Sequence, residues 1–147
     1  MMPSLESTAR AGRKVSAILL VIAAAGLGSA CQRPARCATC GMKIDPASAW
    51  VGYVDIDGRE VPFDTPRCAL TAWRAAESRA KDARFREYYS QDLKHVGELR
   101  FVAGSNVVGP MGPDLVPIAA DKASRFARDH NGAPPKSADE LLRDGLP

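Results

Sequence analysis

The first extended pattern in the chain is an apolar run near its start. Residues 15–27 are almost all apolar and follow three basic residues. A run of this length is too short to cross a bilayer as a mature helix, but it suits the core of an export signal. Small residues at 28–30 precede Cys31, as in a bacterial lipobox that is cut before its cysteine. We therefore expect a signal peptide over residues 1–30 and a lipid-modified Cys31, with an ordinary secretory signal as the alternative.

Apolar and polar positions alternate along the next patterned stretch. Residues 50–56 read as a half-buried strand, with every second residue on one face. Asp57-Gly58 is a strong signal for a two-residue hairpin, so residues 59–63 are expected to return antiparallel. Pro62 cannot donate to a ladder, which puts this second strand at an edge.

A helix is expected to follow the hairpin. Asp64 or Thr65 can cap it, and Pro66 falls in its first turn, where proline is tolerated. A further strand is predicted over residues 85–90. Together these elements predict a β-β-α-β lobe over residues 37–92.

The pattern resumes after a predicted loop at residues 92–97. Strands are expected over 99–102 and 115–118, and residues 118–127 show helical spacing of apolar positions. Residues 137–140 match a capping box that opens a short final helix. A second lobe is therefore expected over residues 93–147.

The expected fold class is α+β, with two small β-β-α-β lobes packed together after the cleaved N-terminal signal. Residues 31–36 would form a lipid-anchored linker. The chain has 20 basic and 17 acidic residues, and they are interleaved rather than gathered in one patch. This distribution argues against nucleic acid as a partner.

The cysteines carry the most informative chemistry. Once Cys31 is lipidated, Cys37, Cys40 and Cys68 remain, and an odd number of thiols cannot all pair within one chain. Met42 places a thioether two residues after Cys40. Soft sulfur donors this close together favour a soft ion, and Cu(I) is the first candidate.

Cys68 is expected in the first turn of the helix. There the macrodipole and the free N–H groups lower a thiol's pKa, whereas a small buried core residue is the competing interpretation. A zinc site would need a fourth ligand beside the three cysteines. His95 or His130 could supply it, but their spacing does not point there.

The two methionines beyond the leader both lie in turns rich in glycine or proline. Met42 follows Gly41, and Met111 stands in Gly109-Pro110-Met111-Gly112-Pro113. Such turns present a side chain rather than pack it. We interpret both thioethers as ligands.

The order of these motifs resembles the NosL family, whose members are copper-binding lipoproteins that assist the maturation of nitrous-oxide reductase. The matching segments are Cys31, Cys37-x-x-Cys40-Gly41-Met42, Phe63-Asp64 leading to Cys68, Tyr88-Tyr89, Gly109-Pro110-Met111-Gly112, and residues 124–132. The resemblance implies a two-lobed fold and copper transfer to a partner rather than catalysis, so no enzyme activity is expected.

The same resemblance implies the ligands and the partners. Cys40 and Met42 match the main ligand motif and Met111 matches the later methionine, while Cys37 and Cys68 are additional candidates. The expected partner is a copper-requiring enzyme or its assembly complex, in particular the machinery that matures nitrous-oxide reductase. A homodimer that shares a site is an alternative to a monomer.

Location follows from the leader and the residue after it. Export with acylation would anchor the protein on the periplasmic side of a membrane. Gln32, rather than an aspartate, follows the cysteine, which favours the outer membrane.

A second class of function competes with copper delivery. Cys37 and Cys40 could act as an exported thiol–disulfide oxidoreductase. Met42 and Met111 separate the two hypotheses, because disulfide exchange needs no thioether while Cu(I) uses it well.

Overall fold

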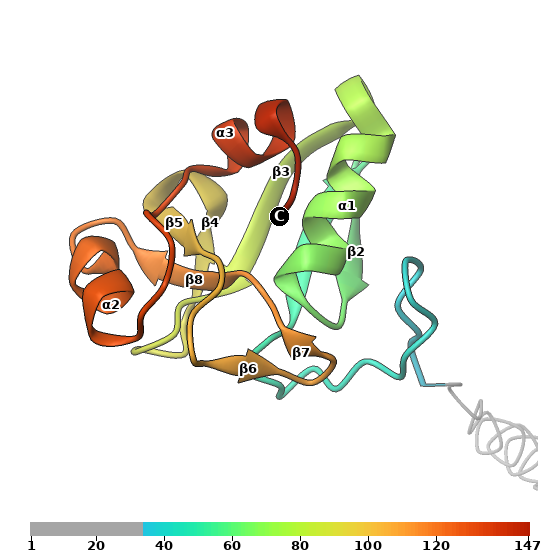
Figure 1. Ribbon diagram of the computed structural model, residues 1–147. Helices are drawn as coiled ribbons and strands as arrows, with labels where there is room; N and C mark the ends of the chain where they lie inside the picture. The colour runs from blue at the N-terminus through green and yellow to red at the C-terminus, as the bar shows by residue number, and fades with distance from the viewer. Residues whose placement is uncertain (1–33) are drawn as a thin grey trace, which may run out of the picture. The chain divides into compact units, whose positions relative to one another are not determined.

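A four-stranded antiparallel sheet forms the first half of the fold. The computed structural model describes residues 34–147, so the predicted signal peptide and Cys31 lie outside the described residues. The strands are β1 (Gly52–Ile56), β2 (Arg59–Phe63), β3 (Ala80–Arg86) and β4 (Leu93–His95), in the spatial order β2-β1-β3-β4 (Figure 1). Asp57 and Gly58 close the first hairpin with φ of 54° and 74°. The predicted hairpin and the edge position of Pro62 are therefore confirmed.

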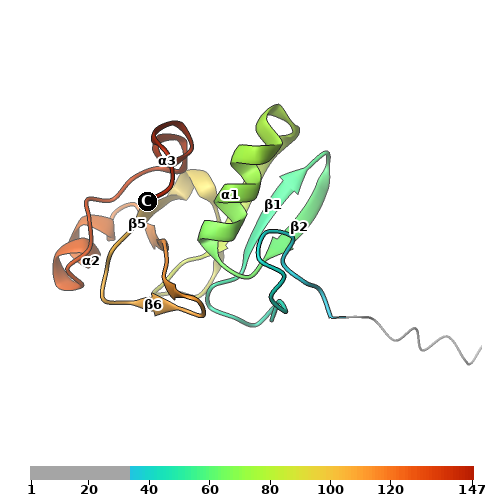
Figure 2. The same ribbon diagram turned by 45° about the vertical axis from the view of Figure 1, so that its right-hand side comes forward.

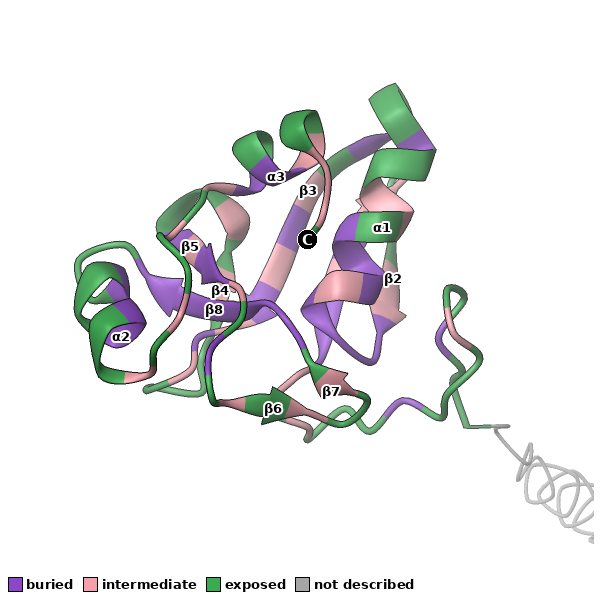
Figure 3. Ribbon diagram, viewed as in Figure 1, coloured by how far each residue is buried: buried purple, intermediate pink, exposed green. Residues whose placement is uncertain are grey.

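Helix α1 (Pro66–Ala76) packs against this sheet. Thr65 is its N-cap, with its side chain accepting from the Cys68 N–H at 3.3 Å. Ala69 and Leu70 are fully buried on the side facing the strands. Figure 3 shows the contrast between this buried side and the exposed outer side of the helix. Burial of that face supplies most of the helix's stability, because a helix of this length is marginal alone.

The third strand differs from its prediction over residues 85–90. It runs over Ala80–Arg86 and stops because the next side chain competes for backbone N–H groups. The Glu87 carboxylate accepts from Tyr89 N–H at 3.0 Å and Ser90 N–H at 2.7 Å, which folds the chain into a turn. The predicted loop at residues 92–97 contains β4 and the start of a 3₁₀ turn, Val96–Glu98.

The second half contains two small two-stranded sheets and two short helices. Its elements are β5 (Leu99–Val102), β6 (Val108–Gly109), β7 (Gly112–Pro113), β8 (Val116–Ala119), α2 (Ala123–Asp129) and α3 (Ala138–Asp144). Strand β5 pairs antiparallel with β8, and on its other side Phe101 bridges to Lys136. Strand β5 is thus central, as β1 is in the first sheet. The helix begins only at Ala123, because Ile118 and Ala119, which fit the helical spacing, belong to the buried strand β8.

The two halves share a core. Phe85 and Phe101 meet edge-to-face with ring centroids 5.1 Å apart, and Glu87 Oε1 accepts from the Ala119 N–H at 3.2 Å. The mixture of helices and antiparallel sheets confirms the α+β class, while the lobe boundaries at residues 37–92 and 93–147 stay predictions. Within residues 34–147, no helix has the length and apolar character needed to span a bilayer.

Candidate metal centre

A closed loop over residues 35–44 presents the first two thiols. The Cys37 N–H donates to the Met42 carbonyl at 2.9 Å, and the Gly41 N–H donates to the Cys37 carbonyl at 2.8 Å. The Ile44 N–H closes the base of the loop on the Ala35 carbonyl at 2.9 Å. Gly41 has a φ of +78°, a left-handed conformation that glycine adopts without strain. The Cys-x-x-Cys pair therefore lies in a turn, as its flanking glycine predicts.

The third thiol comes from the first turn of α1. The N-cap Thr65 fixes this turn, and a second hydroxyl ties it to the cysteine loop: Thr39 Oγ1 donates to the Cys68 carbonyl at 3.0 Å. This bond joins two segments that are 29 residues apart in the sequence. Cys68 is consequently held beside the loop that carries Cys37 and Cys40.

These three cysteines and one carboxylate form a compact cluster. One ligand atom from each of Cys37, Cys40, Asp64 and Cys68 lies within 4.8 Å of all the others. Three of the four residues are buried, with 2% of Cys37, 6% of Asp64 and 7% of Cys68 exposed. Cys40 is only partly buried. The cluster therefore opens toward solvent at Cys40.

Burial dominates the pKa values of two of the thiols in the cluster. Burial raises the pKa of the Cys68 thiol, which corrects the expectation that the helix N-terminus lowers it. Burial also raises the pKa of Cys40, with the Met42 N–H partly offsetting it and the Asp64 carboxylate adding to it. Burial alone would raise the pKa of Asp64 as well, but the thiols of Cys37, Cys40 and Cys68 hold that pKa below its usual value.

The raised pKa values favour neutral thiols at Cys40 and Cys68, and the lowered pKa favours an ionised carboxylate at Asp64. Cys40 Sγ donates to Asp64 Oδ1 at 3.2 Å, whereas Asp64 Oδ2 is buried and has no hydrogen-bond partner. A buried polar atom without a partner costs free energy unless a ligand satisfies it. Thiols release protons when they bind a metal, so the residues present fit a cation that draws in both sulfur and oxygen.

The five predicted ligands fall into two groups in the structure, three clustered cysteines and two exposed methionines. Cys37, Cys40 and Cys68 come together in the cluster, while Met42 and Met111 are exposed, by 46% and 56%. The Met42 N–H lies beside the Cys40 sulfur. The expected approach of Met111 to Met42 stays a prediction.

The turn that carries Met111 is tied to the helix that carries Cys68. Met111 stands between β6 and β7, and Figures 1 and 2 both show this hairpin beyond the N-terminal end of α1. Asp114 follows the hairpin directly, and its Oδ1 accepts from the Arg67 N–H at 3.0 Å. This bond fixes the base of the hairpin to the first turn of α1.

Asp64 was one of two helix caps expected from the sequence, and it was not predicted to lie beside the cysteines. Thr65 takes the cap instead, which leaves the Asp64 carboxylate free to face the thiols. Its position four residues before Cys68, at the start of a helix, was the available signal. The two histidines lie elsewhere: His95 contacts Asp82, and His130 stacks on Phe126.

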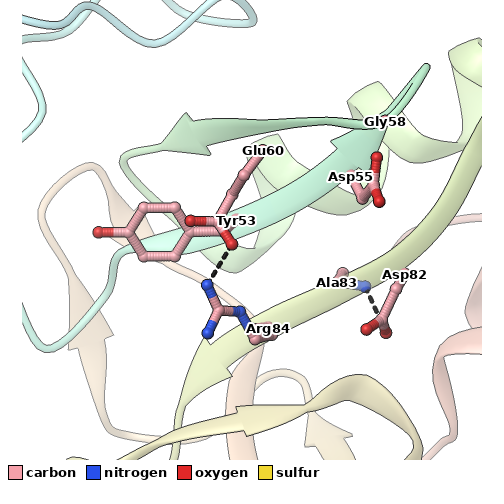
Figure 4. Close-up of a pocket in the computed structure, with 7 residues that line it drawn as sticks. All are labelled: Tyr53, Asp55, Gly58, Glu60, Asp82, Ala83 and Arg84. Atoms are coloured by element: carbon pink, nitrogen blue, oxygen red, sulfur yellow. Dashed lines mark hydrogen bonds and ion pairs between the residues drawn. The ribbon is translucent and has the colours of Figure 1, made fainter.

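Apart from the cysteine cluster, a hollow of about 230 Å³ lies over the four-stranded sheet (Figure 4). Asp55, Glu60 and Asp82 line it, and Arg84 pairs with Glu60 there. Asp82 accepts from the Ala83 N–H at 2.8 Å. The acidic side chains that line this hollow offer oxygen ligands, which suit hard cations rather than soft ones. The cysteine cluster is therefore the better candidate for a soft metal.

Comparisons with known proteins identify a family and a similar fold. Residues 29–144 match the model of a protein family described as NosL. Among solved structures, the fold is similar to the copper chaperone NosL from Shewanella denitrificans, with a TM-score of 0.62 over 72% of this chain and 88% of that chain. The two sequences are 18% identical, so this likeness bears on the fold. No curated protein matches the sequence significantly.

Proposed function

Because the chain belongs to the NosL family, we propose that it binds Cu(I) and delivers it for metalloenzyme assembly, in particular that of nitrous-oxide reductase. The family resemblance predicted from the cysteine and methionine motifs is confirmed. The observation that carries the proposal is the meeting of Cys37, Cys40 and Cys68 in one cluster. These residues come from two segments that are distant in the sequence.

The sulfur ligands favour copper in its Cu(I) oxidation state. Thiolate and thioether donors favour Cu(I) over harder divalent ions. Cys40 is the central ligand of the proposed site, because it is the most accessible of the three thiols and has the Met42 backbone beside its sulfur. Cys37 and Cys68 support it from the buried side.

Transfer to a partner requires an open side. Met42 and Met111 are the exposed sulfur residues of the described chain. Thioethers are weak, neutral ligands that a partner's cysteine or methionine can replace one at a time. We therefore assign them the outer side of the Cu(I) site, where the ion leaves.

The competing oxidoreductase function has less support. All three cysteines among residues 34–147 carry free thiols. Disulfide exchange needs an accessible thiolate of low pKa, whereas burial raises the pKa of Cys40 and of Cys68. Such thiols are poor nucleophiles but become good ligands once a metal displaces their protons.

Membrane anchoring is the second part of the proposal, with Cys31 as the acylated residue on the periplasmic side, outer membrane favoured. We expect wild-type protein to incorporate labelled fatty acid and to sediment with membranes, and Cys31→Ser to lose the label. Wild-type protein that is recovered soluble and without acyl chains would leave plain export as the better account.

Met111→Leu tests the outer side of the Cu(I) site. Leucine keeps the volume and the apolar character of methionine but removes the sulfur, and the side chain is exposed. We expect Cu(I) affinity, or the rate of transfer to a Cu(I) chelator, to fall by about tenfold, with little change in melting temperature. Val108→Leu, an exposed substitution in the same hairpin, is the matched control. A variant that melts much earlier yet binds Cu(I) normally would make Met111 a packing residue.

A further inference from the structure

The hairpin that carries Met111 packs on the indole ring of Trp50. Gly109, the last residue of β6, lies so close to this ring that an added Cβ would stand 3.3 Å from the ring atom Cε3 and 3.4 Å from Cδ2. Glycine therefore lets the backbone of the hairpin approach the ring directly. In Figures 1 and 2 the segment that precedes β1 passes beside the β6–β7 hairpin, in agreement with this contact. The ring thus supports the base of the hairpin.

Asp114 provides a second contact at the same base. Its Cβ atom lies 3.3 Å from the position that an added Cβ would take at Gly109, and its Oδ1 accepts from the Arg67 N–H at 3.0 Å. Asp114 is buried, whereas Met111 at the tip is exposed. The hairpin is therefore held at its base by Trp50 and Asp114 and presents its tip to solvent.

Trp50 is a firm support because its own surroundings hold it. Its N–H donates to Ser48 Oγ at 3.1 Å, and Val51, the next residue, is fully buried. The partly buried side chain of Trp50 packs against the buried cluster of the second half, which includes Val116 and Phe126. A tryptophan has only two side-chain torsions, so little conformational entropy is lost in keeping it there.

The tip of the hairpin is restrained by the residues on each side of Met111. Pro110 fixes the backbone φ directly before it, and Gly112 directly after it has a φ of +102°, which glycine adopts without strain. The position of the Met111 thioether is therefore set by the position of the hairpin base.

We propose that Trp50 is a positioning residue of the Cu(I) site. Its indole ring holds the β6–β7 hairpin in place, so that the thioether of Met111 stays where it can reach an ion held by Cys40. A ligand that is already in place avoids an ordering cost when the ion binds. The effect of Trp50 on copper rests on the proposed function, while its support of the hairpin belongs to the metal-free fold.

Methionine methyl NMR of the reduced, metal-free full chain tests the support of the hairpin. The Met111 signal is assigned by its loss in Met111→Leu. We expect Trp50→Ala to shift or broaden this signal by more than its linewidth while the Met42 signal keeps its position, and Trp50→Phe, which keeps a flat ring, to leave both near their wild-type positions. Trp73→Ala, which removes the other tryptophan of the chain from α1, is the matched control. An unchanged Met111 signal in Trp50→Ala would overturn the proposal.

Gly109→Ala disturbs the same contact from the hairpin side, so the test stands even if Trp50→Ala folds poorly. The φ of Gly109 lies outside the left-handed region, and the added methyl group meets the ring rather than straining the backbone. We expect the Met111 signal to move here as well. Gly97→Ala is the control, because an added Cβ there meets nothing within 4 Å. Equal movement of the Met111 signal in both alanine variants would contradict the assigned contact.

Competition for Cu(I) separates a positioning role from general packing. Trp50→Ala is expected to lower Cu(I) affinity by about three- to tenfold in the wild-type background and by less than about twofold in the Met111→Leu background, because its effect passes through the sulfur. Equal losses in the two backgrounds would refute a role through Met111. If Met111→Leu binds Cu(I) as tightly as wild type while Trp50→Ala still moves the Met111 signal, the outer side of the proposed copper site is wrong and the support of the hairpin by Trp50 stands.

Discussion

Cys40→Ser is expected to lower the Cu(I) affinity of the protein by about 100-fold, which corresponds to about 2.7 kcal/mol of binding free energy. Cys40 is the most accessible thiol of the cluster, and it is the ligand that the proposed site shares between its buried thiols and its exposed thioethers. A serine hydroxyl is a hard donor that stays protonated and does not replace a thiolate on Cu(I). Competition with a Cu(I)-specific chelator under reducing conditions measures the effect.

Cys37→Ser is the matched control for this prediction. Cys37 lies on the same loop but is buried, and we expect its loss to weaken Cu(I) binding less than the loss of Cys40 does. Met42→Ala is expected to weaken binding substantially. If the two serine variants behave alike and Met42→Ala has no effect, a dithiol or redox site becomes the better account, and the reduction potential of the pair is then the quantity to measure.

Glu87→Gln is expected to lower the free energy of unfolding by about 2–3 kcal/mol. Glu87 is fully buried and accepts three backbone N–H groups, from Tyr89 and Ser90 on one oxygen and from Ala119 on the other. A glutamine amide can accept on one side only, and its NH₂ group would face N–H donors on the other. The variant therefore leaves buried donors unsatisfied where the two halves of the fold meet, and denaturant unfolding measures the loss.

The stability difference between wild type and Glu87→Gln is expected to depend on pH in one direction. Burial alone would raise the pKa of Glu87, but the N–H groups of Ser90 and Ala119 outweigh it and hold that pKa below the ordinary value of 4.5. A carboxyl group with a lowered pKa contributes its stability above its unfolded pKa and loses it as pH falls through the folded pKa. The gap between wild type and Glu87→Gln should therefore be full near neutral pH and should narrow below about pH 4.5.

Glu77→Gln serves as the control for Glu87, because Glu77 is exposed. Surface substitutions of this kind usually change stability by less than about 0.5 kcal/mol. An effect of Glu87→Gln no larger than that of Glu77→Gln, or a gap that widens toward acid pH, would contradict the role assigned to Glu87.

The parts of the fold that could be predicted from the sequence depend on short-range chemistry. Asp57-Gly58 makes its turn because both residues adopt positive φ, and Ser137 with Glu140 forms a complete capping box. The end of β3 could not be predicted in this way. It depends on Glu87, whose carboxylate contacts a strand that is 32 residues away.

The candidate site also has a part that follows from local sequence and a part that depends on long-range contacts. Cys37 and Cys40 are close in sequence, and their turn was predicted from Gly41. Cys68 was a candidate only through the family resemblance, because no local pattern places it beside them. That meeting depends on the bond from Thr39 to the Cys68 carbonyl. The place of Asp64 in the cluster could not be predicted, because it depends on burial beside thiols, a property of the folded chain.

Copper binding by the reduced full chain is the most direct test of the central claim. The protein should bind one Cu(I) per chain and retain it against a Cu(I)-specific chelator. A protein that holds Zn(II) as tightly as Cu(I) or more tightly, or that yields all its Cu(I) to a weak chelator, would contradict the account.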